Sequence, residues 1–275
     1  MPKNPPDLPP IPSVTTLDEV IDAIASIIDW SIGATSRLGY FAALYKRITI
    51  AVDTAIEHDM FEDGPRMERF DVAFARRYFD ALNGYFHPGR YPRPTYSWQV
   101  TFDAASRPEP IIAQHMLVGV NAHIDLDLGI AAQTVTPGAQ LPALQEDFNR
   151  INAVLAGQLN GIVASINELS PVLADLYAAL MENEINLINA GVKSYRDSAW
   201  RFATVLAVEP SFAHPATIWA RDLKVAAKGA AIYNPPEPIG SIVGAIAARE
   251  SRDIVKNIKV LDKIASTPAP IQTTM

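Results

Sequence analysis

The chain has 275 residues, of which 49% are hydrophobic and 19% are charged, and its formal net charge is −7. These values are those of a globular protein that is long enough to bury a substantial core. The negative charge argues against a nucleic-acid binder, which needs a basic face, and the absence of cysteine excludes disulfides and thiolate metal sites. No apolar run reaches the roughly 18 residues that span a bilayer. The first residues lack the apolar region of a secretory signal, so we expect a cytoplasmic protein.

The first 14 residues contain six prolines and no periodic apolar pattern, which predicts a disordered or extended arm over residues 1–14. A mobile tail is the favoured form. The alternative is an arm that lies along a second copy of the chain in a homo-oligomer. We expect a single helical domain over residues 15–265 and a loose, polar tail over residues 266–275.

Apolar residues recur at three- and four-residue spacing along most of the chain, as they do in amphipathic helices. The clearest ranges are 36–61, 65–86, 144–169 and 239–264. Alternating period-two runs that flank a hairpin turn are missing, so we expect no strands. The sequence therefore predicts an all-α protein, a single bundle-like domain of about eight helices with short connections.

One predicted helix, residues 114–128, is apolar on most sides and still carries several polar residues. At about 100° per residue these residues fall into three groups. The groups are Gln114, Asn121 and Asp125 on one stripe, His123 and Asp127 on the opposite side, and His115 between them. An unpaired buried polar group costs on the order of 1–3 kcal/mol, so we expect this helix to be buried against partners and to be the best candidate for a site.

A divalent metal site is one interpretation, because four of the five histidines fall within residues 58–123. A zinc or iron site with nitrogen and oxygen ligands would draw on the following side chains: His115, His123, Asp125 or Asp127, completed by His87, His58, Asp71 or Glu57. On a regular helix His115 and His123 lie about 12 Å apart along the axis, so they can share one ion only if the helix is broken. No cofactor is required by a motif, since phosphate loops, dinucleotide fingerprints and His-Glu-x-x-His are absent.

Two metal-free interpretations stay open for the pair formed by His123 and Asp127. Their spacing suits a general base whose imidazole is oriented by a carboxylate. The same spacing occurs in purely structural networks, in which His123 donates to Asp127 while Asn121 and Gln114 satisfy loop backbone. The structural network is the more common role for such residues.

Five blocks of sequence together resemble a family of bacterial helical proteins that is catalogued as a domain of unknown function. The blocks are residues 71–78, 98–105, 114–124 and 147–152 and Trp200. The resemblance covers roughly residues 40–205. It implies an all-α fold, draws attention to the helix with the pattern Gln-His…Asn-x-His, and implies no established reaction.

We hypothesise an enzyme that acts on a small, largely apolar metabolite in a polar pocket within the helical core, by acid–base or metal-assisted chemistry. The alternative is a non-catalytic helical ligand-binding or scaffold protein with a structural buried network. The expected catalytic residues are His115, His123 and Asp71. The side chains expected to bind the small-molecule ligand are Gln114, Asn121, Asp125, Asp127, Trp98 and Asp103, and the metal-ligand candidates are His115, His123, Asp127 and His87.

Overall fold

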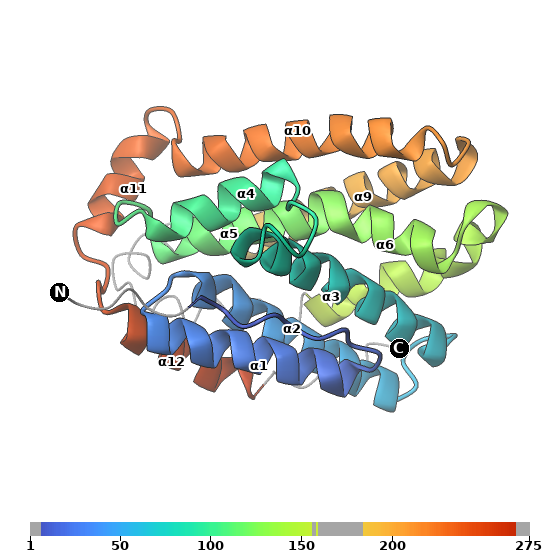
Figure 1. Cartoon of the computed structure of the whole chain (residues 1–275), viewed down its shortest axis with the longest axis horizontal. Coiled ribbons are helices and arrows are strands. Elements are labelled where there is room, and N and C mark those ends of the chain that lie inside the picture. Colours follow the sequence, from blue (N-terminus) through green and yellow to red (C-terminus); the bar gives the residue numbers. More distant parts are fainter. Residues whose placement is uncertain (1–6, 156–157, 159–183, 268–275) are drawn as a thin grey trace.

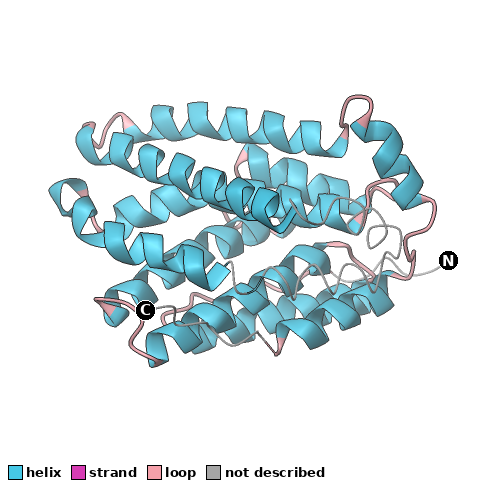
Figure 2. Ribbon diagram, turned by 180° about the vertical axis from the view of Figure 1, so that it is seen from behind, coloured by secondary structure: helices cyan, strands magenta, loops and turns pink. Residues whose placement is uncertain are grey.

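The computed structural model describes residues 7–155, 158 and 184–267 of the chain. Within these residues the secondary structure consists of α-helices with short 3-10 and π segments, and it includes no strand (Figure 2). The predicted all-α fold is confirmed. None of the helices in the described ranges is long and apolar enough to cross a membrane.

The helices stack in layers around one large hydrophobic cluster, with two smaller clusters beside it (Figure 1). On one side α1 (Leu17–Ala34), α2 (Leu38–Glu57) and α12 (Ile254–Ala265) pack together. The middle holds α3 (Gly64–Phe86), α4 (Tyr96–Asp103), α5 (Ile112–Ala122) and α6 (Leu128–Val135). On the other side α9 (Glu184–Val208) packs on α6, and α10 (His214–Tyr233) lies along α4 and α5. The predicted helix at 114–128 therefore runs through the centre of the molecule.

Local sequence explains where the helices begin. The Thr16 hydroxyl accepts a hydrogen bond from the Glu19 backbone N–H (3.3 Å), with acidic residues in the first turn of α1. The Asp63 carboxylate accepts one from the Arg66 N–H (2.9 Å) at the start of α3, where a proline occupies the first turn. These caps satisfy backbone donors that have no partner inside the helix.

Close helix crossings depend on small residues in the central helix. A Cβ atom added at Gly119 would lie 2.4 Å from the Phe41 ring, so α5 can approach α2 only with glycine there. At Gly129 an added Cβ would lie 2.8 Å from the Ala199 carbonyl oxygen, which brings α6 equally close to α9. Both contacts draw the surrounding helices onto the central one.

The predicted helix at 239–264 is wrong as a single element, because the chain breaks it into α11 (Ile239–Ala247) and α12. The Glu250 carboxylate lies in the break and accepts a hydrogen bond from the Ile112 N–H (2.9 Å) at the start of α5. Asp253 then caps α12 through the Lys256 N–H (2.9 Å). Glu250 thus adds to the cap that α5 supplies itself, in which Gln114 Oε1 accepts from the Ile111 N–H (3.0 Å).

Two other predicted helices are only partly described. A 3-10 helix spans Gly138–Leu144, and residues 145–155 then continue as a helix. The rest of the predicted helix at 144–169 is described only at residue 158, and the predicted helix that follows Ser170 lies outside the described residues before 184.

The proline-rich segment is held against α3 over its described part, residues 7–14. Leu8, Ile11 and Val14 are buried. The Asn83 side chain bonds both backbone groups of Ile11, donating to its carbonyl (2.9 Å) and accepting from its N–H (2.8 Å). A mobile tail does not describe these residues, because they pack in extended form on their own chain. Of the predicted tail at 266–275, only the first two residues are described.

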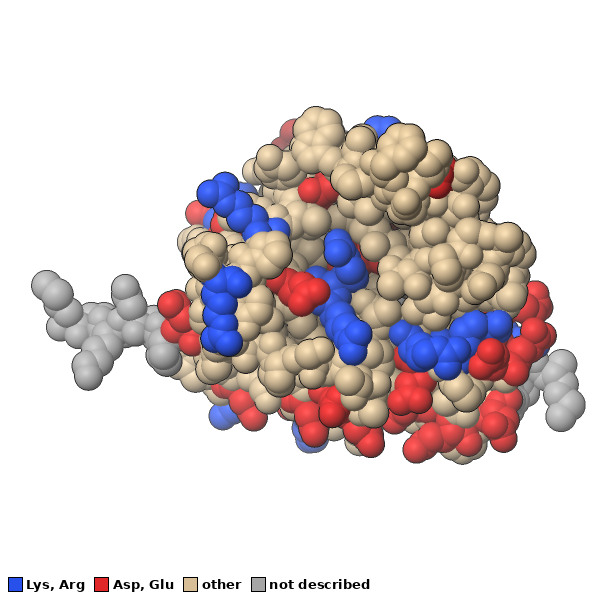
Figure 3. All heavy atoms as spheres, turned by 45° about the vertical axis from the view of Figure 1, so that its right-hand side comes forward, with Lys and Arg blue, Asp and Glu red and all other residues tan. Residues whose placement is uncertain are grey.

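The surface in Figure 3 shows lysine and arginine in small groups, separated by neutral and acidic residues. On this face the basic residues therefore form no continuous patch of the kind that binds a nucleic-acid backbone.

Candidate functional site

The central helix is broken where its histidine and aspartates lie. Residues His123–Asp127 form a π-helix between α5 and α6, and the Leu128 N–H donates to the His123 carbonyl in the i to i+5 pattern of such a segment. Segments of this kind are rare inside α-helices and occur frequently at functional sites. The π segment begins at His123, so the stretch from His115 to Ala122 is regular α-helix, and the break that a metal site shared by His115 and His123 would need does not lie between them.

His123 is oriented by the carboxylate of Asp127. Its Nδ1 lies 3.3 Å from Asp127 Oδ2, and its side chain is 2% exposed. Asp127 also accepts hydrogen bonds from Trp98 Nε1 (2.7 Å) and from Arg77 Nε (3.1 Å). A carboxylate only accepts, so the proton of the neutral imidazole is placed on Nδ1 and the lone pair on Nε2.

Aromatic rings fix the plane of His123 as well. The Phe74 ring stacks on the imidazole with centroids 3.5 Å apart and planes 8° apart, and the Tyr45 ring meets it edge-on at 4.7 Å. Burial lowers the pKa of His123, and this effect exceeds the opposing effect of Asp127. The imidazole is therefore neutral at neutral pH, with one nitrogen available to accept a proton.

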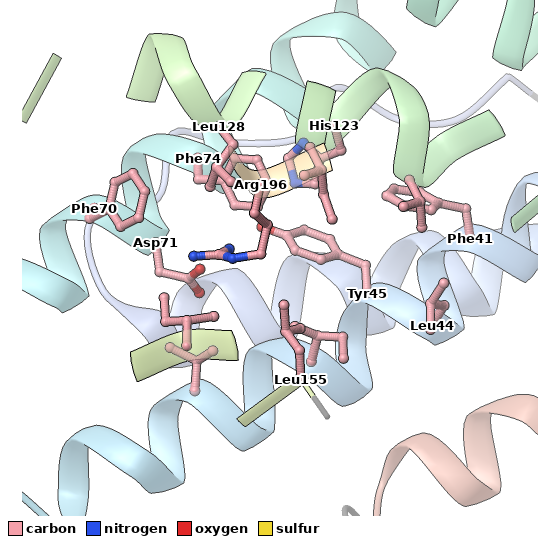
Figure 4. Close-up of a pocket in the computed structure, with 15 residues that line it drawn as sticks. Phe41, Leu44, Tyr45, Phe70, Asp71, Phe74, His123, Leu128, Leu155 and Arg196 are labelled. Carbon is pink, nitrogen blue, oxygen red and sulfur yellow. The ribbon is translucent and has the colours of Figure 1, made fainter. Parts of the chain in front are cut away.

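Beside His123 lies a cavity of about 110 Å³. Most of its wall is apolar and comes from α2, α3 and the central helix, with Leu44, Ile48, Val52, Phe70 and Ile124 among the lining residues. Figure 4 shows that side chains from these separate elements converge on one space. The volume is of the same order as the engineered cavity of about 150 Å³ that accepts benzene.

The polar side chains that line this cavity all carry a buried atom without a hydrogen-bond partner. These atoms are Tyr45 Oη, Asp71 Oδ2, His123 Nε2 and Arg196 Nε. In Figure 4 the carboxyl of Asp71 and the guanidinium of Arg196 are directed toward one another. Leaving such a group unpaired costs about 1–3 kcal/mol, so four in one cavity is a large deviation from ordinary core packing.

Burial shifts the ionisation of these groups. It raises the pKa of Asp71 to about 7, with a further rise from Asp53 that Arg196 opposes. It lowers the pKa of Arg196 to about 9, which still leaves the guanidinium charged at neutral pH. Burial also raises the pKa of Tyr45, so its hydroxyl is a neutral hydrogen-bond donor. The site therefore holds a neutral base, a cation, a phenol and a carboxyl that titrates near pH 7.

The other stripe of the central helix does not line this cavity. Gln114 Nε2 donates to the Ile232 carbonyl (2.7 Å) and Asn121 Nδ2 to the Val225 carbonyl (2.9 Å). Asp125 accepts from Lys228 Nζ (2.6 Å) and from the guanidinium of Arg221. The three residues predicted on one stripe do share a face, but that face holds α10, and none of the three lines this cavity.

His115 lies apart from His123. Its Nδ1 is 3.4 Å from the Tyr233 hydroxyl, while its Nε2 has no partner. Burial lowers the pKa of His115 to about 3, helped by Arg37 and Arg107. The space beside it, which Trp98 also lines, measures only about 10 Å³, enough for a single water. The structure therefore does not place His115 in the same cavity as His123 and Asp71.

The remaining predicted residues have other partners. Asp103 is exposed, accepts hydrogen bonds from the Tyr85 hydroxyl (3.0 Å) and Gln99 Nε2 (2.9 Å), and does not line the cavity. His87 Nε2 bonds the Leu8 carbonyl (2.8 Å) and holds the N-terminal segment. His58 lies exposed at the end of α2. Across residues 7–155, 158 and 184–267, no three histidine, aspartate or glutamate side chains lie together as metal ligands.

Sequence reasoning missed Tyr45 and Arg196, although both left a signal. Tyr45 has the spacing of the buried apolar stripe of α2, so periodicity alone assigns it to the core. Arg196 lies three residues before Ala199 and seven before Ala203, which are both buried. A charge in register with an apolar helical stripe predicts a buried cation. Its proximity to Asp71 comes from the tertiary fold, which no local pattern reveals.

Comparison with known proteins gives one match. The model of a family of unknown function, DUF5995, matches residues 17–235. The predicted resemblance to an uncharacterised helical family is therefore confirmed, and the match extends beyond residues 40–205 at both ends. No curated protein and no solved structure matches the chain.

Proposed function

The chain belongs to the family of unknown function DUF5995, and from its cavity we propose that it is an enzyme that performs acid–base chemistry on a small, largely apolar molecule. The observation that carries this proposal is His123. Its Nδ1–H is held by a buried carboxylate, and its Nε2 has no partner beside the apolar cavity. An oriented, neutral imidazole with a free lone pair is the usual arrangement of a general base.

The neighbouring groups suit the two halves of a proton transfer. When His123 Nε2 takes a proton from the substrate, the positive charge on the imidazole is stabilised by Asp127 through Nδ1–H. Asp71, whose pKa is raised to about 7, can return a proton to the atom that gains negative charge. The Tyr45 hydroxyl is a second donor for that atom. In such a transfer one proton leaves the substrate, one is returned, and no oxidant is needed.

A ligand-binding protein without catalysis is the alternative, and one observation favours it. The burial of His123 opposes a positive imidazole, which lowers its strength as a base. The bonds from Gln114, Asn121 and Asp125 to α10 support a structural role for the rest of the central helix.

Proton exchange separates catalysis from binding alone. The protein is incubated in D₂O with a set of small ketones, esters and carboxylic acids, and deuterium incorporation at carbon is followed by NMR. We expect exchange with at least one compound that binds, and we expect His123→Gln to abolish it. His58→Gln, a change at an exposed histidine, is the control and should leave exchange unaltered. Compounds that bind the wild-type protein but never exchange would refute catalysis and leave a ligand-binding protein.

A further inference from the structure

We infer that the ligand is a small monocarboxylate. This inference rests on the proposed function, because it takes this cavity as the ligand site. The ligand's carboxylate pairs with Arg196, and its short aliphatic or cyclic body lies against the apolar wall. The inference depends on the way the chain holds one buried cation.

Arg196 is buried without a charge partner. It is 3% exposed, its Nη2 donates to the Phe148 carbonyl, and its guanidinium carbon lies 4.2 Å from the centre of the Phe148 ring. Its Nε has no partner, and no carboxylate oxygen in the described ranges lies within 4.0 Å of its nitrogens. A buried cation of this kind is costly unless an anion compensates it, and guanidinium binds carboxylate through two parallel hydrogen bonds.

Three other buried carboxylates are each paired with a cation, whereas Asp222 and Glu250 accept hydrogen bonds from backbone N–H groups instead. Asp127 pairs directly with Arg77 (3.1 Å), Asp147 with Arg66 (2.8 Å), and Asp125 with Lys228 (2.6 Å). Each of them is completely or almost completely buried, and each is compensated by a cation from another helix.

Asp71 shares its cavity with Arg196 without such a pair, and its Oδ2 is unpartnered. Carboxyl and guanidinium face the same space from α3 and α9 (Figure 4). A ligand carboxylate placed between them would accept hydrogen bonds from the Arg196 guanidinium and one from the hydroxyl of protonated Asp71. Arg196 Nε and Asp71 Oδ2 would then both have a partner.

The rest of the wall limits the ligand to one charged end. Leu44, Ile48 and Val52 on α2, and Ile124 and Leu128 on the central helix, offer no polar atom from their side chains. The cavity of about 110 Å³ holds a body of roughly benzene's size. A sugar, a nucleotide or a dicarboxylate would leave polar groups facing these side chains without partners, which costs binding energy.

The test compares acids with their neutral amides on the full-length protein. Binding of isovalerate, benzoate, isovaleramide and benzamide is measured by calorimetry at pH 6.5 and by the NMR signals of the protein. We expect the carboxylates to bind at least about tenfold more tightly than the amides, because only they supply the anion that Arg196 lacks. We expect Arg196→Met to remove this preference and Arg196→Lys to keep part of it. Arg201→Met is the matched control on the exposed side of the same helix and should change nothing.

The outcomes separate failure of the carboxylate inference from failure of the proposed ligand site. Amides that bind in the cavity as tightly as the acids overturn the carboxylate inference and leave the cavity as the ligand site. Failure of acids and amides alike to bind overturns the ligand site itself. Since acids and amides are compared on the wild-type protein, the inference can be refuted even if the Arg196 variants do not fold. Retention of the full preference in folded Arg196→Met would also overturn it.

Discussion

The two sides of the central helix carry similar polar residues and use them differently. Toward α10, Gln114, Asn121 and Asp125 each reach a direct partner on that helix, and only Asn121 Oδ1 among their described side-chain atoms is buried without one. Toward the cavity, His123 and the groups around it end in atoms that have none. Polar residues in a core are ordinary when they are paired, so the cavity side is the one that requires a functional explanation. Removing a paired side chain on the α10 side should therefore lower the free energy of unfolding, whereas removing an unpartnered group on the cavity side should not.

The largest effect is expected from Asp125→Ala, which removes the carboxylate that holds Arg221 and Lys228. We expect a loss of about 2–4 kcal/mol in the free energy of unfolding, since a part-buried guanidinium loses its partner. Denaturant unfolding followed by circular dichroism measures it, with the exposed Glu146→Ala as the control near zero. A loss below 0.5 kcal/mol would mean that this side is not held by its polar pairs.

On the cavity side, we expect Asp71 to make the free energy of unfolding fall as the pH rises. Its folded pKa of about 7 lies above its ordinary value of 3.8, so its contribution is present below pH 4 and is lost as pH rises through 7. Each pH unit in this window costs up to about 1.4 kcal/mol, or roughly 2–3 kcal/mol between pH 4.5 and 6.5. The stability of wild type minus that of Asp71→Asn isolates this effect from Glu250, whose pKa is also raised to about 7. A difference that stays constant with pH would contradict an unpaired Asp71.

A smaller loss is expected from Asn121→Ala. The amide hydrogen bond to the Val225 carbonyl disappears and a void replaces the buried amide, which costs about 1–2 kcal/mol. The measurement is again denaturant unfolding, and the exposed Asn149→Ala serves as its control. Equal stabilities for the two variants would count against a structural role for this face.

The smallest effect is expected from Tyr45→Phe and has the opposite sign. Because the hydroxyl is buried without a partner, its removal should leave stability unchanged or raise it by up to about 1 kcal/mol. Tyr85→Phe removes a hydroxyl that donates to Asp103 and should cause a small loss under the same conditions. A clear loss in Tyr45→Phe would show that the hydroxyl has a structural partner.

Periodicity was enough to predict much of this fold, and its failures have physical causes. Three-four spacing identified the helical class, and it placed Gln114, Asn121 and Asp125 on one face of the central helix. It could not predict that Glu250 would cap α5, because that bond joins residues 138 positions apart. Half of the cavity's polar set was predicted, His123 and Asp71. Arg196 and Tyr45 are brought to it by helix packing, which local spacing does not encode.

The most direct test of the account is the histidine ¹⁵N NMR spectrum of the protein with and without a small carboxylate such as isovalerate. We predict that His123 is neutral at pH 7, with its proton on Nδ1, and that its Nε2 signal moves when the ligand is added. The signal of the exposed His58 should stay unchanged by the ligand. A His123 that carries its proton on Nε2, or whose signals ignore every ligand that binds the protein, would contradict the assignment of this cavity as the active site.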